Sequence, residues 1–165
     1  MVKNGPILAN TLYVDNVLSA EDVEFTLPAI EATTADVEAM GTMSFPIWAR
    51  LEDMEASITK VGLDKGFSRM IDASMKTYEF RFPQETIDEA GNTKIVACKA
   101  FVKGIPASVP EIGVVPGEAT SSEVTIKATR YQLFVDGKEV HLVDRLAGIL
   151  KINGHNYSSG VKNLL

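Results

Sequence analysis

The sequence predicts a mainly β protein with one clear helix. Apolar and polar residues alternate with a period of two in most of the chain, and Pro, Asn and Gly residues separate these segments. Apolar residues fall clearly at helical spacing in only one place. The chain has 165 residues, which is enough to bury a core, and no change in composition divides it. We therefore expect residues 1–165 to form a single domain.

The N-terminal part is expected to contain a hairpin and two further strands. Leu12–Val14 and Val17-Leu18 flank Asp15-Asn16, a pair suited to a tight turn. Strict alternation then predicts strands over 22–27, which Pro28 ends, and over 54–59.

The C-terminal part is expected to contain the longer strands, over 78–82, 94–102, 123–135 and 138–143. Turn residues at 89–92 and at Asp136-Gly137 separate them, so the last two strands form a long hairpin. Its first strand changes pattern midway. The apolar residues from Val124 to Ala128 share one face, whereas those from Tyr131 to Val135 share the opposite one. Either a bulge near Thr129 shifts the register, or both faces are covered.

The clear helix lies near residues 63–71. Leu63, Phe67, Met70 and Ile71 follow helical spacing, and Asp64 is placed to cap or to charge the first turn. The segment 142–150 is apolar enough for a short helix or a strand. Gly148 makes the helix less favourable, because glycine has a low helix propensity. The segment ends near Asn153-Gly154, another turn signal.

Three segments are expected to be irregular, namely 33–48, 105–120 and 157–165. A compact domain seldom keeps such long loops without a purpose. The first one holds the only tryptophan and shows no clean periodicity. It either folds onto its own core or contacts a partner, because aromatic and Met side chains contribute strongly at interfaces. The interface candidates are Met40, Gly41, Met43, Phe45 and Trp48.

A search for chemistry yields no catalytic site, cofactor site or metal site. His141 and His155 share no ligand spacing, and a metal site needs three or four ligands. Cys98, the only cysteine, lies in an apolar strand where a thiol packs as a small hydrophobe. The acidic residues at 52, 53 and 55 precede an amphipathic strand and are expected to be solvated. We expect no enzyme.

Composition excludes several other classes of protein. The formal charge is −6, which argues against a nucleic-acid-binding protein, because such proteins neutralise phosphates with clustered Lys and Arg. The first residues lack the apolar core of a signal peptide, and no run approaches the ~18 apolar residues of a membrane span. We expect a soluble product, with no membrane insertion, that stays in the compartment where it is made.

Two stretches of the C-terminal third carry a family resemblance. The segment 129–140 (TRYQLFVDGKEV) is followed by Val143-Asp144 and then by 151–154 (KING). This order resembles the end of the major tail tube proteins of contractile phages of the P2 type. The N-terminal part agrees in order and spacing, since 10–14 leads to a Thr-Leu-Pro segment within 25–30. The segments 33–48 and 105–120 depart most from the family.

The resemblance implies a tail-tube fold, a small antiparallel barrel or sandwich with one flanking helix and long assembly loops. It further implies a structural subunit that forms hexameric rings, stacked into a hollow conduit for DNA or tail components. The implied partners are the chain itself, the tail sheath, and tape-measure and baseplate proteins. The implied location is the tail of a virion or tail-like particle, after assembly in the bacterial cytoplasm.

Two hypotheses on assembly follow, and three alternatives stay open. The 33–48 segment bridges subunits or rings, and an acidic lumen lets DNA pass without specific binding. Lumen-facing candidates are Glu123, Thr125 and Lys127, on a face that the sequence does not assign. The alternatives are a type VI secretion tube or headless tail bacteriocin, a monomeric β-barrel binding module, and an enzyme.

Overall fold

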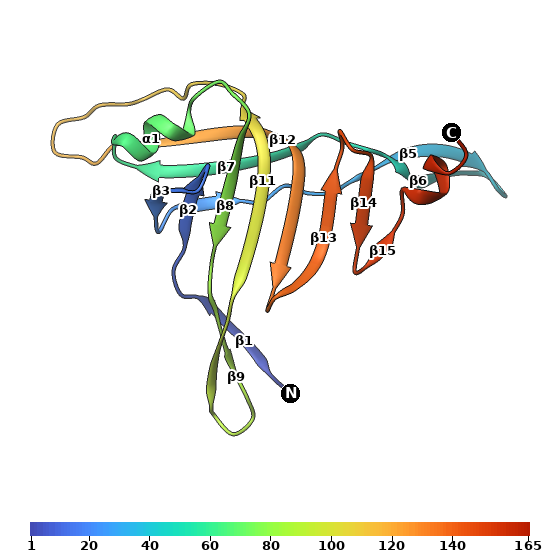
Figure 1. Cartoon of the computed structure of the whole chain (residues 1–165), viewed down its shortest axis with the longest axis horizontal. Coiled ribbons are helices and arrows are strands. Elements are labelled where there is room, and N and C mark those ends of the chain that lie inside the picture. Colours follow the sequence, from blue (N-terminus) through green and yellow to red (C-terminus); the bar gives the residue numbers. More distant parts are fainter.

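The computed structural model describes every residue from Met1 to Leu165, and antiparallel strands make up most of it. Figure 1 shows a bent main sheet from which two strand-built arms project, one beside the C-terminus and one beside the N-terminus. The prediction of a mainly β protein is confirmed. That residues 1–165 form one domain stays a prediction.

The main sheet is open. In spatial order its strands are β15 (His155–Asn156), β14 (Ile149–Ile152), β13 (Lys138–Asp144), β12 (Ser121–Val135), β11 (Cys98–Pro106), β8 (Lys76–Arg81), β2 (Thr11–Val14) and β3 (Val17–Glu21). Two more strands, β7 (Met54–Val61) and β4 (Glu24–Thr26), join it beside β12. Because β15 and β3 remain edges that do not pair with each other, the sheet does not close. The expected barrel is therefore corrected to an open, bent antiparallel sheet.

A β-bulge at Thr129 produces the bend. Lys103 of β11 pairs with Arg130, but the next residue, Gly104, pairs with Ala128, so Thr129 is an extra residue in β12. The first alternative for this strand is thereby confirmed. An extra residue reverses which positions face the core, and Ala128 and Tyr131 are accordingly both buried. The two halves of β12 also have different neighbours, β7 before the bulge and β13 after it.

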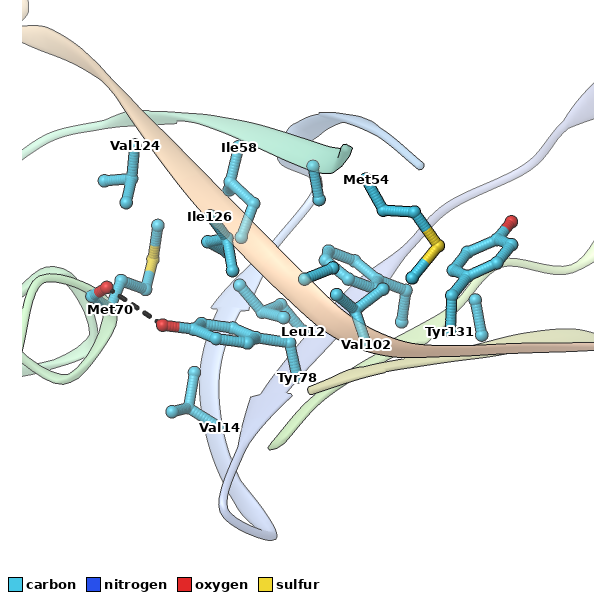
Figure 2. Close-up of a cluster of buried hydrophobic side chains, with 14 of the residues drawn as sticks. Leu12, Val14, Met54, Ile58, Met70, Tyr78, Val102, Val124, Ile126 and Tyr131 are labelled. Carbon is cyan, nitrogen blue, oxygen red and sulfur yellow. Dashed lines mark hydrogen bonds between the residues drawn. The ribbon is translucent and has the colours of Figure 1, made fainter. Parts of the chain in front are cut away.

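The core fills the space between the two halves of the bent sheet. Figure 2 shows Ile58 and Val124 on one side of this cluster and Leu12, Val14 and Tyr78 on the other. All five side chains are almost completely buried. The alternation of β7 and β12 thus points its apolar residues inward and its polar residues outward.

The helix α1 (Lys65–Met70) lies beside β3 and contributes Phe67 and Met70 to the buried side chains. The Asp64 carboxylate accepts a hydrogen bond from the amide of Phe67 at 2.9 Å, as expected for an N-cap. The same carboxylate lies 3.1 Å from Nζ of Lys60, a side chain that is only 9% exposed. The hydroxyl of Tyr78 donates to the carbonyl of Met70 at 3.2 Å and ties the helix to β8 (Figure 2).

Several local predictions have clear outcomes. The turns at Asp15-Asn16 and Asp136-Gly137 are confirmed, and all four residues have positive φ. Residues 142–150 form no helix; they end β13, turn at Gly148, and begin β14, so the strand alternative is correct. The expected strand 94–102 is interrupted at Ala97. The tail contains a short helix, α2 (Ser159–Lys162), where we expected none.

Two smaller sheets form the arms. The first contains β1 (Lys3–Ile7), β9 (Gln84–Ile87) and β10 (Thr93–Val96), in the order β1-β9-β10. The second is a hairpin of β5 (Ala32–Glu38) and β6 (Thr42–Leu51).

We predict that Gly104→Ala destabilises the protein by about 1–3 kcal/mol, the usual cost of overpacking. A Cβ atom at this position would lie 2.4 Å from the carbonyl oxygen of Lys127, a backbone atom that cannot move aside alone. Urea unfolding followed by circular dichroism measures the change. The control is Gly160→Ala, where nothing lies within 4 Å of the new Cβ. Equal midpoints for Gly104→Ala and wild type would show that the bulge does not constrain this site.

We predict that Asp64→Ala costs about 1 kcal/mol or more at pH 7, because the helix loses its cap and Lys60 its ion-pair partner. The Phe67 amide and the Lys60 ammonium hold the pKa of this carboxyl below its ordinary value of 3.8. Its contribution is therefore present above about pH 4 and is lost as the pH falls through the lowered pKa.

Urea unfolding of both proteins at pH 7 and at pH 2.5 tests this dependence. The difference in stability should shrink at the lower pH. Glu31→Ala, which removes an exposed carboxylate without a side-chain partner, serves as control. A difference that is the same at both values of pH would contradict the assigned role of Asp64.

Candidate assembly surfaces

The segment 33–48 forms an extended hairpin, and our expectation of an irregular loop is wrong. β5 and β6 pair with each other and with no other strand (Figure 1). The signal that sequence reasoning missed is a period of two, in which Met43, Phe45 and Ile47 alternate with Ser44 and Pro46. The hairpin register, which only the structure gives, aligns this alternation with that of β5.

One face of this hairpin is apolar. Residues directly opposite each other in an antiparallel pair lie on the same face, and here Ala35 opposes Phe45 while Val37 opposes Met43. Phe45 is 53% exposed and Met43 41% exposed. No residue of β5 or β6 is buried. The face therefore presents apolar side chains that the chain itself does not cover. We call it the hairpin face, defined by Ala35, Val37, Met43, Phe45 and Ile47.

The structure divides the five predicted interface residues among three places. Met43 and Phe45 belong to the hairpin face. Met40 and Gly41 form the turn, both with positive φ, and Met40 is fully exposed. Trp48 lies near the base, where the pairing shifts between Ala32 and Thr33 so that residues 48–50 are extra in β6.

Trp48 lines a cleft at the base of the hairpin. The cleft has a volume of about 560 Å³, and its walls come from the base of β5–β6, the turn between β13 and β14, and the C-terminal segment. Arg145 fixes this arrangement, because its guanidinium donates to the carbonyls of Leu51 and Glu52, each at 3.0 Å. Sequence reasoning gave no sign of the cleft, since its walls are about 90 residues apart along the chain.

The second arm also exposes apolar side chains. Ile95 of β10 is 62% exposed, and Ile7 of β1 and Ile87 of β9 are partly exposed. We did not predict β1, whose pairing with β9 connects segments about 80 residues apart. Gly5 is required there, since a Cβ would lie 2.9 Å from the carbonyl oxygen of Glu85.

Glu123, Thr125 and Lys127 share one face, which points away from the core. Each pairs with an outward residue of β7, and Lys127 lies 2.8 Å from the carboxylate of Glu55. This outer face also carries Glu24 on β4. Three carboxylates against one ammonium leave it mildly acidic. The outward face of the rest of the sheet carries both signs of charge. Glu79 is paired with Arg81 and Lys99, and Asp144 with Arg130, while Lys103 and Lys151 are further basic residues.

The groups considered for chemistry are dispersed. Cys98 is buried, and burial raises the pKa of its thiol, which opposes formation of a nucleophilic thiolate. The ring of His141 stacks on Tyr131 with centroids 4.7 Å apart, and burial lowers its pKa. No three His, Cys, Asp or Glu side chains are grouped so that they could hold a metal ion. Neither helix has the length and apolar character needed to cross a bilayer.

Comparison with known structures shows the fold. A chain of the sheath–tube complex of the extracellular contractile injection system PVC, in its extended state, has a TM-score of 0.53 and 13% identity. The match covers 78% of this chain and 90% of that one. A chain of the tube-terminating cap of the anti-feeding prophage gives 0.54 and 14%, covering 78% and 89%. A chain of the PVC sheath/tube terminator gives 0.51 and 12%, covering 78% and 95%.

Comparison with curated protein sequences gives no match. Comparison with protein families gives one over nearly the whole chain, the family of phage tail tube protein FII, which matches residues 6–165. The resemblance drawn from residues 129–154 is thereby confirmed, and neither the binding module nor the enzyme is favoured. The chain belongs to the phage tail tube protein FII family and is a non-enzymatic structural subunit of the tube in a phage tail or tail-like particle.

Proposed function

We propose that copies of this chain form hexameric rings, and that the rings stack into a hollow conduit for DNA or tail components. The observation that carries the proposal is the hairpin face, which leaves Met43 and Phe45 exposed on a projecting arm. An isolated two-stranded hairpin is marginally stable in water. A contact that covers its apolar face both removes this surface from water and orders the arm. We assign that contact to a neighbouring subunit or to the next ring.

The open sheet supports the same proposal. Its edges β3 and β15 lie at opposite ends of the main sheet in Figure 1. An uncovered edge offers unpaired N–H and C=O groups to another chain. A ring brings the β3 edge of one subunit near the β15 edge of the next. The edges are then covered by the assembly rather than by the chain.

We further propose that a sheath encloses the tube, and that tape-measure and baseplate proteins contact it. The first structure compared above is described as a sheath–tube complex, and it shares this fold. Nothing in the structure favours a type VI secretion tube or a headless bacteriocin over a phage tail.

We propose that the outer face with Glu123, Thr125 and Lys127 lines the lumen. Its net negative charge repels phosphate groups, so DNA passes without adhering. The competing candidate is the outward face with Lys99 and Lys103, which carries basic side chains beside Glu79 and Asp144 and would repel phosphate groups less than the acidic face does.

We predict that the double substitution Met43→Ser/Phe45→Ser leaves a folded chain that assembles poorly. Buried aromatic and Met anchors commonly contribute about 2 kcal/mol or more at an interface, and 1.4 kcal/mol corresponds to a tenfold change. The protein concentration needed for tube formation should therefore rise at least about tenfold. Sedimentation and negative-stain electron microscopy measure it.

Ser44→Ala, on the opposite face of the same strand, is the matched control and should assemble as wild type does. Circular dichroism checks that each variant is folded. Tubes of the double variant at the wild-type concentration would exclude the hairpin face from assembly.

We predict that a reconstruction of the assembled tube by electron cryo-microscopy places Glu123 and Lys127 at the inner wall. A functional test uses the double substitution Glu24→Lys/Glu123→Lys, which changes the charge of this face from −2 (three carboxylates, one ammonium) to +2 (one carboxylate, three ammoniums). Tubes of that variant should retain short DNA at low salt and release it at about 0.5 M salt, because the attraction is screened. An inner wall formed by Lys99 and Lys103 would contradict the proposal.

A further inference from the structure

The loop between β11 and β12, residues 107–120, has no role in the tube described so far. It projects at the α1 end of the molecule, in gold in Figure 1. Val109 and Val114 are 68% and 76% exposed, and Val115 is also exposed. Between residues 108 and 119 the backbone makes one hydrogen bond, from Glu118 to Val115. The loop is thus apolar, and its own chain leaves it almost entirely uncovered.

Proline limits the conformations of this loop. Pro106, Pro110 and Pro116 each have a fixed φ, and Pro110 and Pro116 lie within the exposed part. A segment restricted in this way loses less conformational entropy when it binds than a free chain does. The loop therefore suits insertion into a preformed site.

Such a site lies toward the opposite end of the molecule. The cleft of about 560 Å³ beside the C-terminus has an apolar lining that includes Trp48, Ile149 and Val161. It is also basic: Arg50, Arg145 and Lys162 line it together with one acidic side chain, Asp144, and only Arg145 of the three has an ion-pair partner, Asp53 at 3.9 Å.

Arg50 is exposed and forms no hydrogen bond or ion pair within the chain. The side-chain Nζ of Lys162 donates only to the carbonyl of Ala147, at 3.2 Å. The cleft therefore holds positive charge that the chain does not neutralise.

The loop carries the complementary charge. Glu111 and Glu118 are exposed, and neither carboxylate has a partner in the chain. They flank the apolar run from Ile112 to Val115, so an apolar centre with two acidic ends faces an apolar cleft with basic residues. The hairpin tip is a poorer match, because its carboxylate at Glu38 already accepts a hydrogen bond from Thr42 at 2.8 Å.

We propose that the 107–120 loop of one subunit inserts into the cleft of the adjacent subunit in the same ring. This contact rests on the proposed function and deepens it, since it supplies a lateral partner for each copy. In Figure 1 the loop and the elements that line the cleft, β6, β14 and the C-terminal segment, lie at opposite ends of the long axis, so the contact is head-to-tail. A head-to-tail contact closes into a ring when its rotation permits. The same contact brings the β3 end of one subunit to the β15 end of the next.

Charge reversal with complementation tests the contact. Glu111→Lys/Glu118→Lys changes only the loop, and Arg50→Glu/Lys162→Glu changes only the cleft. Each double variant alone should need at least about tenfold more protein to form tubes, because like charges then meet at every lateral contact. An equimolar mixture should return to within about threefold of wild type, since alternating subunits pair a reversed loop with a reversed cleft and an unchanged loop with an unchanged cleft.

All positions are exposed, and circular dichroism shows whether each variant is folded. If the two variants form tubes when they are mixed, both must be folded, because misfolded chains could not restore assembly. Normal assembly of the loop variant, or no rescue in the mixture of folded variants, would overturn the proposal.

Cross-linking identifies the occupant of the cleft directly. In a Cys98→Ala background, tubes of Val114→Cys/Val161→Cys should yield a ladder of disulfide-linked subunits on oxidation, and neither single substitution should yield more than dimers. A ladder from Met40→Cys/Val161→Cys instead would assign the cleft to the hairpin tip and overturn the proposal. Tubes without the first ladder would overturn it as well. Wild-type chains that form neither rings nor tubes would contradict the proposed function itself, and this contact with it.

Discussion

The close approach of β11 to β12 at the bulge is the constraint on which the rest of the structure depends. Gly104 has no side chain, so its backbone lies against residues 126–128 at a distance that a Cβ atom would not permit. Thr129 is then extra, β12 bends, and its inward positions change from even to odd numbers. One strand can thus border the core on both sides of the bend. Without the added residue, either Ala128 or Tyr131 would face solvent.

The bend also determines which segments of the chain remain outside the core. The core lies between the two halves of one sheet, so both arms and the 107–120 loop extend beyond it. Their apolar side chains, among them Phe45, Ile95 and Val114, lie outside that core and are exposed. A monomer seldom exposes so many such segments, and a subunit that is covered on several sides by copies of itself does so routinely. Membership in the tail tube family explains why this chain exposes them, because a tube subunit contacts other subunits.

Charged side chains are also distributed unevenly over the surface of the molecule. The formal charge of −6 is not spread evenly, since the outer face of β7 and β12 is acidic while the cleft is basic. An even distribution would make copies repel each other on every side. A divided one favours particular orientations of neighbouring copies, which is how charged surfaces contribute to specificity more than to affinity.

The sequence by itself determined the β class, the turns at Asp15-Asn16 and Asp136-Gly137, and Asp64 at the start of the helix, and it limited β12 to two alternatives, of which the structure shows the bulge near Thr129. It also determined the family. These features depend on neighbouring residues, through alternation, positive φ and side-chain capping. Only the tertiary structure decided that residues 33–48 form a hairpin, that β1 pairs with β9, that the sheet stays open, and that distant segments form a cleft. Those features depend on contacts between segments that can lie 90 or more residues apart, as Arg145 and Leu51 do, and local patterns do not specify which partner is chosen.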